Sequence, residues 1–505
     1  MDAFLEKVAE LNGKINGVVW GIPMLILIIG TGIYLTVRTK FFQVIYAKFV
    51  NNETIFAVFK KKSVTKAGEK TAISQFQALS TALAATIGTG NIAGVATAIT
   101  MGGPGAVFWM WLSAFFGMMT NYSENVLGIY YRKRNAKNEW SGGAMYYIEN
   151  GFGRKGAFFK AIAKPLAIIF AIFCALASFG IGNMSQVNSI AGAMESAFSI
   201  PPLATGIALA VIVTLVIIGG VKRIGETAEK IVPFMAIIYI LASLAVLVLN
   251  FKMIPTVFAQ IFACAFSSKA VVGGVAGVAV KQAMTMGFKR GVFSNEAGLG
   301  SSVMVHSASD VKEPVVQGMW GIFEVFFDTM IVCTLTAFTI LSTGVVGATD
   351  AAGKLVEGVP LVSMAFANTF HSIAGDVVAI CVMLFAFTTV LGWSFYGSKA
   401  VEYIAGTKAT IVYKILFVGM IIFGATMKLQ LAWDISDTLN GLMALPNLIG
   451  VLTLSGTVFA ITKNYIARRI KKTDPAAEPM LSAYPEIQQQ QAEALAKEYA
   501  EEIKN

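Results

Sequence analysis

The sequence predicts an all-α membrane protein that crosses the bilayer about eleven times. Three observations support this fold class: 56% of the 505 residues are hydrophobic, only 13% are charged, and the mean hydropathy is +0.68. A soluble domain carries about 25% charged residues, so this chain lacks the charge that a water-exposed surface needs. A spanning helix needs about 20 apolar residues, so a chain of this length has room for about ten to twelve spans. A soluble globular fold and intrinsic disorder are excluded.

Eleven apolar stretches have the length of a spanning helix. They cover about residues 17–37, 72–99, 105–130, 165–192, 202–220, 229–250, 275–300, 318–343, 375–399, 409–429 and 437–463. Asp2, Glu6 and Glu10 outweigh Lys7 before the first stretch, whereas a cleavable signal peptide begins with positive charge. We therefore expect the first stretch to be retained as a span.

Lysine and arginine fall mainly on one side of this predicted topology. With the N-terminus outside, 32 of the 39 basic residues lie in segments 38–70, 131–164, 222–230, 289–312, 399–414 and 463–505. Cytoplasmic segments of membrane proteins carry such an excess. We expect a bacterial or archaeal plasma membrane (cell inner membrane), with the N-terminus outside and the C-terminus in the cytoplasm. The net charge of +10 then reflects topology, and no nucleic acid partner is expected.

The spans divide the chain into six segments. These are an external N-terminus with an extra helix (1–37), a cytoplasmic loop (38–71), a first five-helix repeat (72–250), an external connector (251–274), a second five-helix repeat (275–463) and a cytoplasmic tail (464–505). Because each repeat has an odd number of spans, the two repeats must cross the membrane in opposite directions. The tail is expected to be solvated and to carry no chemistry.

Two spans contain clustered glycines and polar residues at membrane depth. Residues 84–94 read AATIGTGNIAG, and residues 291–302 read GVFSNEAGLGSS. Glycine costs about 1 kcal/mol relative to alanine in a helix, and an unpaired backbone group in hydrocarbon costs several kcal/mol. A sequence that combines both usually lines a cavity. The two clusters occupy corresponding places in the two repeats, which is typical of the binding site of a secondary transporter.

Parts of the sequence also fit other interpretations. Gly90 and Gly94 could simply let two helices approach closely. A dinucleotide-binding fingerprint also fits the glycine spacing, but no strand precedes it and no acidic residue follows about 20 residues later. An enzyme is not expected, since the sequence lacks HExxH, GxSxG, P-loop and CxxC motifs. His306 and His371 are too far apart in the sequence for a multi-histidine metal site.

Six longer motifs resemble those of a known family. They are TALAATIGTGNIAG (81–94), GGPGAVFWMW (102–111), FGIGNM (179–184), KRGVFSNEAGLGS (289–301), TVLGW (389–393) and DTLNGLMALPNLIG (437–450). The chain thus resembles the alanine or glycine:cation symporters, also called the sodium:alanine symporter family, over nearly all residues but the tail. The resemblance implies the leucine-transporter type of fold, in which the first and sixth of ten core helices are broken. It also implies import of small neutral amino acids, alanine and glycine, with sodium as coupling ion and no cofactor.

The resemblance places the substrate at the broken helices. The backbone amides of Thr89 and Gly90 should bind its carboxylate, because the exposed N-terminus of a half-helix attracts anions. Asn91 should steady that turn, and Thr86 should add a carbonyl or hydroxyl oxygen. Phe293 should offer a carbonyl oxygen to the ammonium group and its ring to the pocket.

Three further substrate contacts are expected from other core helices. The third core helix carries Phe179, Asn183 and Gln186, and Gln186 is the expected polar contact. An interhelical hydrogen bond unrelated to substrate remains an alternative for Gln186. Trp393 should wall the pocket at the side-chain end and exclude long side chains, although ordinary packing would also explain this tryptophan.

Sodium is expected beside the first broken helix. By the resemblance, the hydroxyls of Thr388 and Thr389 join the carbonyl oxygens of Ala84 and Ile87 as ligands, since sodium prefers neutral oxygen atoms. Two threonines in an apolar helix also commonly bond to their own backbone, and this alternative stays open.

Acidic residues inside the spans are candidate functional groups. Glu296 follows the second cluster near Lys289 and Arg290, and an inner gate pair is expected there. Asp328 is expected to make a structural hydrogen bond, with a proton relay as the alternative. A proton-coupled transporter of the same fold is therefore the alternative function. The sequence leaves open the choice among alanine, glycine and serine, D-isomer tolerance, stoichiometry and oligomeric state, a monomer included.

Overall fold

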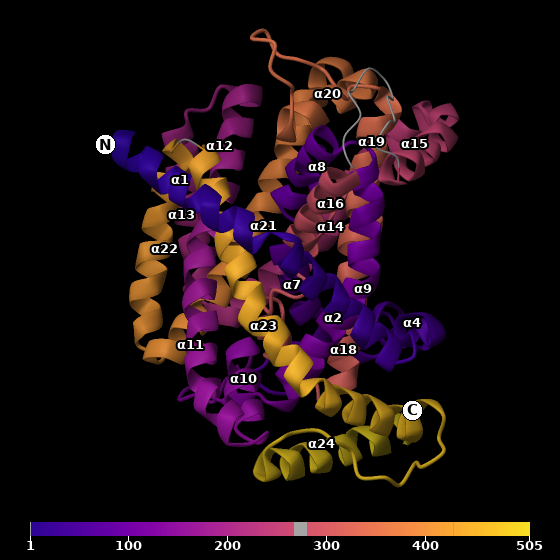
Figure 1. Ribbon diagram of the computed structural model, residues 1–505. Coiled ribbons are helices and arrows are strands. Elements are labelled where there is room, and N and C mark those ends of the chain that lie inside the picture. The colour runs from indigo at the N-terminus through magenta and orange to yellow at the C-terminus, as the bar shows by residue number, and fades with distance from the viewer. Residues whose placement is uncertain (1, 267–279, 428, 505) are drawn as a thin grey trace.

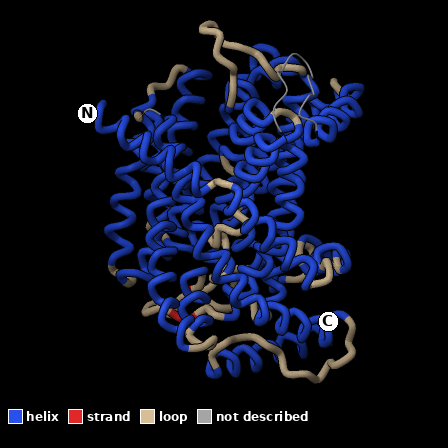
Figure 2. The backbone as a smooth tube through the Cα atoms, in the orientation of Figure 1, coloured by secondary structure: helices blue, strands red, loops and turns tan. Residues whose placement is uncertain are grey.

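Helices make up nearly all of the computed structural model, which describes residues 2–266, 280–427 and 429–504 (Figures 1 and 2). The predicted all-α architecture is thereby confirmed. At the upper end of Figure 1 lie α12 (Ser185–Phe198) and α20 (Gly358–Phe370), and at the lower end lie α10 (Ala144–Phe152) and α24 (Pro485–Lys504). We call these two ends the upper and lower faces. A short antiparallel pair, β1 (Lys133–Arg134) and β2 (Trp140–Ser141), lies at the lower face.

The N-terminal span is longer than the sequence predicts. It consists of α1 (Asp2–Val19) and α2 (Ile22–Arg38), which meet at a bend of 42°. Trp20 at the bend donates from Nε1 to the Asp437 carbonyl oxygen at 2.9 Å, which fastens the helix to the last core span. The predicted loop after it holds four short helices, α3 (Phe42–Ile45), α4 (Ala47–Glu53), α5 (Ile55–Val58) and α6 (Lys62–Thr65).

The first repeat starts at the lower face. Ser74 caps its first helix, since its side chain accepts from the Gln77 amide while the Gln77 side chain accepts from the Ser74 amide. The elements in order are α7 (Gln75–Thr86), η1 (Gly90–Gly94), α8 (Val95–Gly102), α9 (Gly105–Tyr130), α10, α11 (Ala157–Phe179), η2 (Gly180–Met184), α12, α13 (Pro202–Ile217) and α14 (Gly220–Leu249).

The segment predicted to be the second repeat starts towards the upper face, where α16 lies above α18 in Figure 1; the bounds of the two repeats stay a prediction. A connector with η3 (Phe251–Met253) and α15 (Ile254–Phe266) precedes this segment. The sequence predicts neither α15 nor α20. The elements in order are α16 (Val280–Asn295), α17 (Val303–His306), α18 (Pro314–Val325), η4 (Phe326–Cys333), α19 (Thr334–Thr343), α20, η5 (His371–Ile373), α21 (Ala374–Ala405), α22 (Ala409–Thr426), α23 (Leu429–Tyr465) and η6 (Ile466–Ile470).

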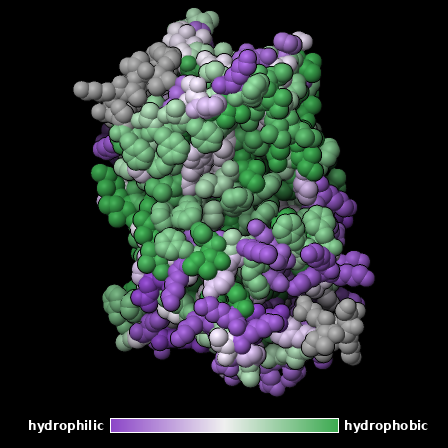
Figure 3. Space-filling view, turned by 90° about the vertical axis from the view of Figure 1, so that its right-hand side faces the viewer, coloured by the Kyte–Doolittle hydropathy of each residue, from purple (hydrophilic) through white to green (hydrophobic). Residues whose placement is uncertain are grey.

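On the face drawn in Figure 3, apolar side chains form a broad band across the middle of the molecule, and hydrophilic ones gather mainly at its lower end. Among the described residues, six helices are long and apolar enough to cross a membrane, or up to eight if each of two bent pairs counts as one span. The long helix α9 is outside this set. It carries Asn121, Ser123, Glu124 and Asn125, all of them buried inside the protein. The count of eleven spans therefore stays a prediction.

The C-terminal tail packs against the lower face, whereas the sequence predicts a solvated segment. Leu481 is fully buried and Leu495 is nearly so. The Ala483 amide donates to the Tyr130 carbonyl oxygen at the end of α9, at 2.9 Å. The tail is polar overall, and its few buried apolar residues contact partners that lie far away in the sequence. The sequence alone therefore does not predict that the tail packs.

Candidate functional site

The first broken helix comes apart at residues 87–89, between α7 and η1. The two helical parts meet at an angle of 50°, and non-helical backbone is visible in the middle of the bundle (Figure 2). Asn91 closes the turn, because its Oδ1 accepts from the Gly88 amide at 2.9 Å. The sequence cluster thus corresponds to a real break at membrane depth.

Gly88 lets two other helices approach this break. A side chain at Gly88 would collide with Thr389 Oγ1 of α21 and lie 3.3 Å from Gln186 Oε1 of α12. Gln186 Oε1 accepts from the Thr89 hydroxyl at 3.0 Å and from the Thr89 amide at 3.3 Å. Gln186 therefore accepts a hydrogen bond from the Thr89 amide, the group that is predicted to bind the substrate carboxylate.

The second broken helix ends at Asn295, and the backbone then follows a loop to Ser302. Glu296, Gly298 and Gly300 have φ values of 55°, 92° and 71°. Gly298 and Gly300 adopt positive φ without the steric cost that a side chain would add. Asn447 of α23 donates from Nδ2 to the Gly298 carbonyl oxygen at 2.9 Å. The last core span thus holds this loop in place.

The two breaks lie side by side. A side chain at Gly90 would lie 3.2 Å from the Phe293 ring and 3.5 Å from Ser294 Cα. The fold therefore brings Thr89, Gly90 and Phe293 together, as a joint site of the two broken helices requires.

The candidate sodium ligands face two directions. Thr389 Oγ1 lies beside Gly88 and donates to the Phe385 carbonyl oxygen at 3.0 Å. Thr388 Oγ1 also donates to that carbonyl oxygen, at 2.9 Å, but lies 3.4 Å from the sulfur of Met235 on α14. Ala84, Thr86 and Ile87, at the end of α7, are buried next to the break; the Thr86 hydroxyl donates to the Ala82 carbonyl oxygen at 3.2 Å.

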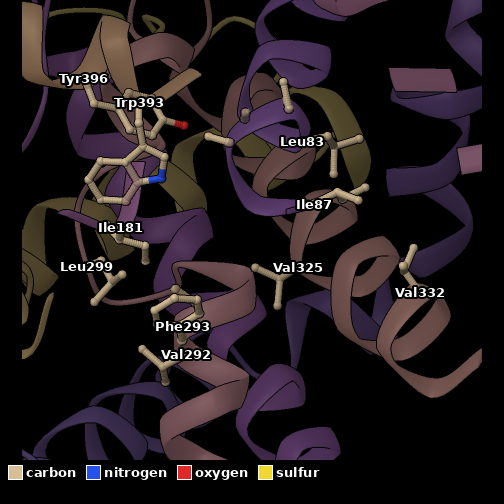
Figure 4. Close-up of a cluster of buried hydrophobic side chains, with 14 of the residues drawn as sticks. Leu83, Ile87, Ile181, Val292, Phe293, Leu299, Val325, Val332, Trp393 and Tyr396 are labelled. Atoms are coloured by element: carbon tan, nitrogen blue, oxygen red, sulfur yellow. The ribbon is translucent and has the colours of Figure 1, made fainter. Parts of the chain in front are cut away.

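Phe179 lies apart from the breaks, whereas Trp393 lies near the second break, where its side chain interacts with the Glu296 carboxylate. The Phe179 ring packs on Tyr413 and Phe417 of α22, with centroids 5.3 and 6.0 Å away. Trp393 is fully buried, its Cβ fills the space above Gly182, and its ring lies 5.4 Å from Tyr396. In the view of Figure 4, Ile181 and Leu299 appear between Trp393 and Phe293.

A cavity of about 1120 Å³ enters from the upper face. Lys289, Arg290, Trp433 and Asp437 are among its lining residues, but none of the residues predicted to bind substrate or sodium is. The Phe293 ring stacks on Trp433 with centroids 5.5 Å apart, and its other side faces Gly90. Trp433 of the cavity wall thus contacts Phe293, which in turn lies beside Gly90 of the first broken helix.

An ion-pair cluster joins α16 to α23 at this cavity. Lys289 Nζ lies 2.7 Å from Asp437 Oδ2, and Arg290 Nη1 lies 3.3 Å from Asp437 Oδ1. The Arg290 guanidinium also lies over the Phe293 and Trp433 rings, 5.5 and 6.0 Å from their centroids. These contacts hold the two rings together.

This cluster overturns the predicted gate pair of Glu296 with Lys289 or Arg290. The Glu296 carboxylate instead accepts from the Ser301 hydroxyl within its own loop. Both basic residues lie on the helical side of the break and line the upper cavity, so segment 289–312 does not belong wholly to one face. Sequence reasoning missed Trp433 and Asp437 as partners, although an acidic residue within a predicted span was a usable signal.

The lower face is closed by backbone contacts. Residues before the first broken helix pair with residues after the second: the Ile73 amide donates to the Ala308 carbonyl oxygen at 3.2 Å, and the Asp310 amide donates to the Ile73 carbonyl oxygen at 2.7 Å. The buried Arg132 donates to the carbonyl oxygens of Ser307, Ser309 and Val311. The structure is thus hollow towards the upper face and shut towards the lower face.

Charge supports the same closure. Burial alone would raise the pKa of Asp310, but the Lys312 ammonium and the amides of Gly68 and Glu69 outweigh it and hold the pKa below its usual range. The carboxylate therefore stabilises the closure at neutral pH, and this contribution is lost when the pH falls through the lowered pKa.

Comparison with known proteins gives consistent results. A model of the sodium:alanine symporter family matches residues 5–479. The sodium/alanine symporter AgcS of Methanococcus maripaludis is 46% identical, over 90% of this chain and 97% of its own. The putative sodium/proton-dependent alanine carrier protein YrbD and the probable sodium/glutamine symporter GlnT, both from Bacillus subtilis, are 36% and 35% identical, over 93% and 94% of this chain and 95% and 94% of their own.

One solved structure has the same fold at low sequence identity. The crystal structure of MhsT in complex with L-phenylalanine superposes with a TM-score of 0.51, over 79% of this chain and 97% of that chain, at 13% identity. This likeness concerns the arrangement of helices alone.

Proposed function

Because this chain belongs to the sodium:alanine symporter family, we propose that it imports small neutral amino acids, alanine and glycine, together with sodium. It is a multi-pass membrane transporter and not an enzyme, and its fold is of the leucine-transporter type. One observation carries the proposal: two broken helices face each other between a cavity on one side and a closed surface on the other. That is the arrangement a transporter needs to expose one site to each side in turn.

The substrate carboxylate binds the backbone amides of Thr89 and Gly90 in this proposal. The Gln186 amide oxygen, which accepts from Thr89, stands in for a carboxylate oxygen. Alanine or glycine displaces it, and Gln186 turns to contact the substrate. The exchange of one acceptor for another leaves no buried donor unpaired, which keeps its energetic cost low. The Phe293 carbonyl oxygen receives the ammonium group.

Sodium binds beside the same break, between the Thr389 hydroxyl and the carbonyl oxygens of Ala84 and Ile87. Thr388 is the second hydroxyl ligand if it turns away from Met235. Since the first break contributes to both sites, ordering its backbone for one ligand favours the other. Such shared ordering links the binding of the two ligands.

We place the lower face in the cytoplasm. Basic side chains such as Arg132, Lys133, Arg154 and Arg468 belong to segments at this face, which supports the orientation by the positive-inside rule. Substrate then enters by the upper cavity, and transport requires the hydrogen bonds of Ile73 with Ala308 and Asp310 to open.

Uptake of radiolabelled alanine into proteoliposomes tests the function. An inward sodium gradient should drive accumulation, while an equal potassium gradient should not. Unlabelled glycine should compete with alanine. Glutamine is tested as a second competitor, because one relative is named a probable sodium/glutamine symporter, and it shows whether a larger side chain is accepted.

Proton coupling is the alternative to sodium coupling. It is supported by the name of another relative, a putative sodium/proton-dependent alanine carrier protein. A pH gradient imposed without sodium distinguishes the two. Accumulation under that gradient, together with indifference to sodium, would replace sodium by protons in the proposal.

A further inference from the structure

Asp328 is a buried acidic residue that makes hydrogen bonds to both broken helices. It lies in η4 and is fully buried. Its Oδ1 accepts from Asn91 Nδ2 at 2.6 Å, immediately after the first break. Its Oδ2 accepts from the Ser294 hydroxyl at 2.9 Å, just before the second break. One carboxylate therefore bonds to a side chain of each broken helix.

The same helix reaches both breaks at other positions. Thr329 accepts at Oγ1 from Asn295 Nδ2 at 3.0 Å, and Thr336 donates to the Asn91 carbonyl oxygen at 2.8 Å. The helix is π-helical here, a wider turn that frequently marks functional positions. Two groups of this helix join Asn91 to Ser294. The Asp328 carboxylate does so at 2.6 and 2.9 Å, and the weaker acceptor, the Cys333 sulfur, lies 3.4 and 3.3 Å from the same two side chains.

The partners of Asp328 are an amide and two hydroxyls, and all of them are neutral. A buried carboxylate that loses a donor pays a large desolvation penalty. If Asn91 moves away, the carboxylate must either follow it and draw Ser294 along or remain with one donor too few, and the same holds if Ser294 moves. The two breaks cannot shift independently while this carboxylate is present.

We propose that Asp328 is a positioning residue that makes the geometries of the two breaks depend on each other, and thereby couples sodium binding to substrate binding. The inference rests on the proposed function. Sodium contacts the first break alone, whereas the substrate contacts both. Ordering of the first break by sodium passes through Asn91, Asp328 and Ser294 to the second break, where the substrate ammonium binds.

The test measures linkage and not activity alone. The half-saturating alanine concentration is determined in proteoliposomes at a low and a high sodium concentration. We expect the unmodified protein to show a ratio of about tenfold, within the usual range of coupling between two sites. Asp328→Asn keeps the shape but replaces one acceptor by a donor, and Ser294→Ala removes the bond to the second break. Both should reduce the ratio to below about twofold.

Ser301→Ala is the matched control, because Ser301 lies in the same broken segment but donates to Glu296. It should keep the tenfold ratio. Thermal unfolding in detergent identifies a variant that fails to fold, and Ser294→Ala decides the question if Asp328→Asn fails. Ratios unchanged in a folded Ser294→Ala or Asp328→Asn protein overturn the coupling role while leaving the function intact. Absence of sodium-driven uptake in the unmodified protein overturns the function itself.

Discussion

Gly88 shows how much of the site depends on one missing side chain. Its backbone lies against Thr389 and Gln186, so the sodium and carboxylate positions that we propose would both require this glycine. Gly88→Ala should reduce alanine uptake at least about tenfold, since overpacking costs about 1–3 kcal/mol and separates the break from α21.

Gly419→Ala is the control for the glycine substitution. Gly419 lies within helix α22, and an added methyl group there meets no neighbour within 4 Å. Its uptake should equal that of the unmodified protein, and its thermal stability should be equal or slightly higher. Equal uptake by the Gly88 and Gly419 variants would contradict the close approach at the break.

Substitutions at Thr389 distinguish a sodium ligand from a hydroxyl that only bonds to its own helix. Thr389→Ala should raise the sodium concentration for half-maximal uptake by about tenfold, the order expected for a lost polar contact of about 1.4 kcal/mol. Thr389→Ser keeps the hydroxyl and should restore the normal value. If both variants have the same sodium dependence as the unmodified protein, Thr389 only bonds to its own helix.

At the scale of an element, α16 carries both the ion-pair cluster at the upper cavity and the segment proposed to bind the substrate. Lys289 and Arg290 reach Asp437, and one turn later Phe293 stacks on Trp433. The helix ends two residues after Phe293. Movement of its last turn therefore changes access from the cavity and the geometry of the second break together.

Asp437→Asn tests whether this cluster acts as a gate. The change leaves two cations without their acidic partner in a largely buried place, which typically costs several kcal/mol, so the closed arrangement of Phe293 and Trp433 should be weakened. We expect the half-saturating alanine concentration to rise about tenfold or more, measured by initial uptake rates. Glu357→Gln alters another carboxyl group that lines the same cavity and should change it less than twofold. Similar values for both variants would refute the gate.

At the scale of the whole molecule, the C-terminal tail ties several lower-face segments together. The Tyr499 hydroxyl and Arg468 both donate to Glu313, the residue before α18, and Arg154 donates to the Ala483 carbonyl oxygen at 2.7 Å. The family model ends at residue 479, so Ala483 and Tyr499 lie beyond the matched segment.

A chain that ends at Asp474 should fold but be less stable. It loses the burial of Leu481 and Leu495, each worth about 1.5–3 kcal/mol, and one partner of Glu313. The midpoint of thermal unfolding in detergent should fall by several degrees. Gln489→Ala, at an exposed position of α24, is the control and should leave the midpoint unchanged. An unchanged midpoint in the truncated protein would show that the tail contributes nothing to stability.

The sequence by itself determined the all-α membrane fold and the positions of the two breaks. The low content of charged residues indicates that lipid surrounds the chain. The glycines and polar residues at 84–94 and 291–302 indicate that the helical backbone is interrupted there. Both are local properties, so they can be recognised without knowing any partner. The likeness of six motifs to one family led in the same way to the family that the comparisons found.

Only the tertiary structure decided which side chains meet. Asp437 pairs with Lys289 and Arg290 across more than 140 positions of sequence, Asp328 joins Asn91 to Ser294, and Phe179 faces α22 away from the breaks. The direction in which a helical side chain points depends on how the helix is rotated and bent against its neighbours. That rotation results from packing of the whole bundle, which no single stretch of sequence encodes.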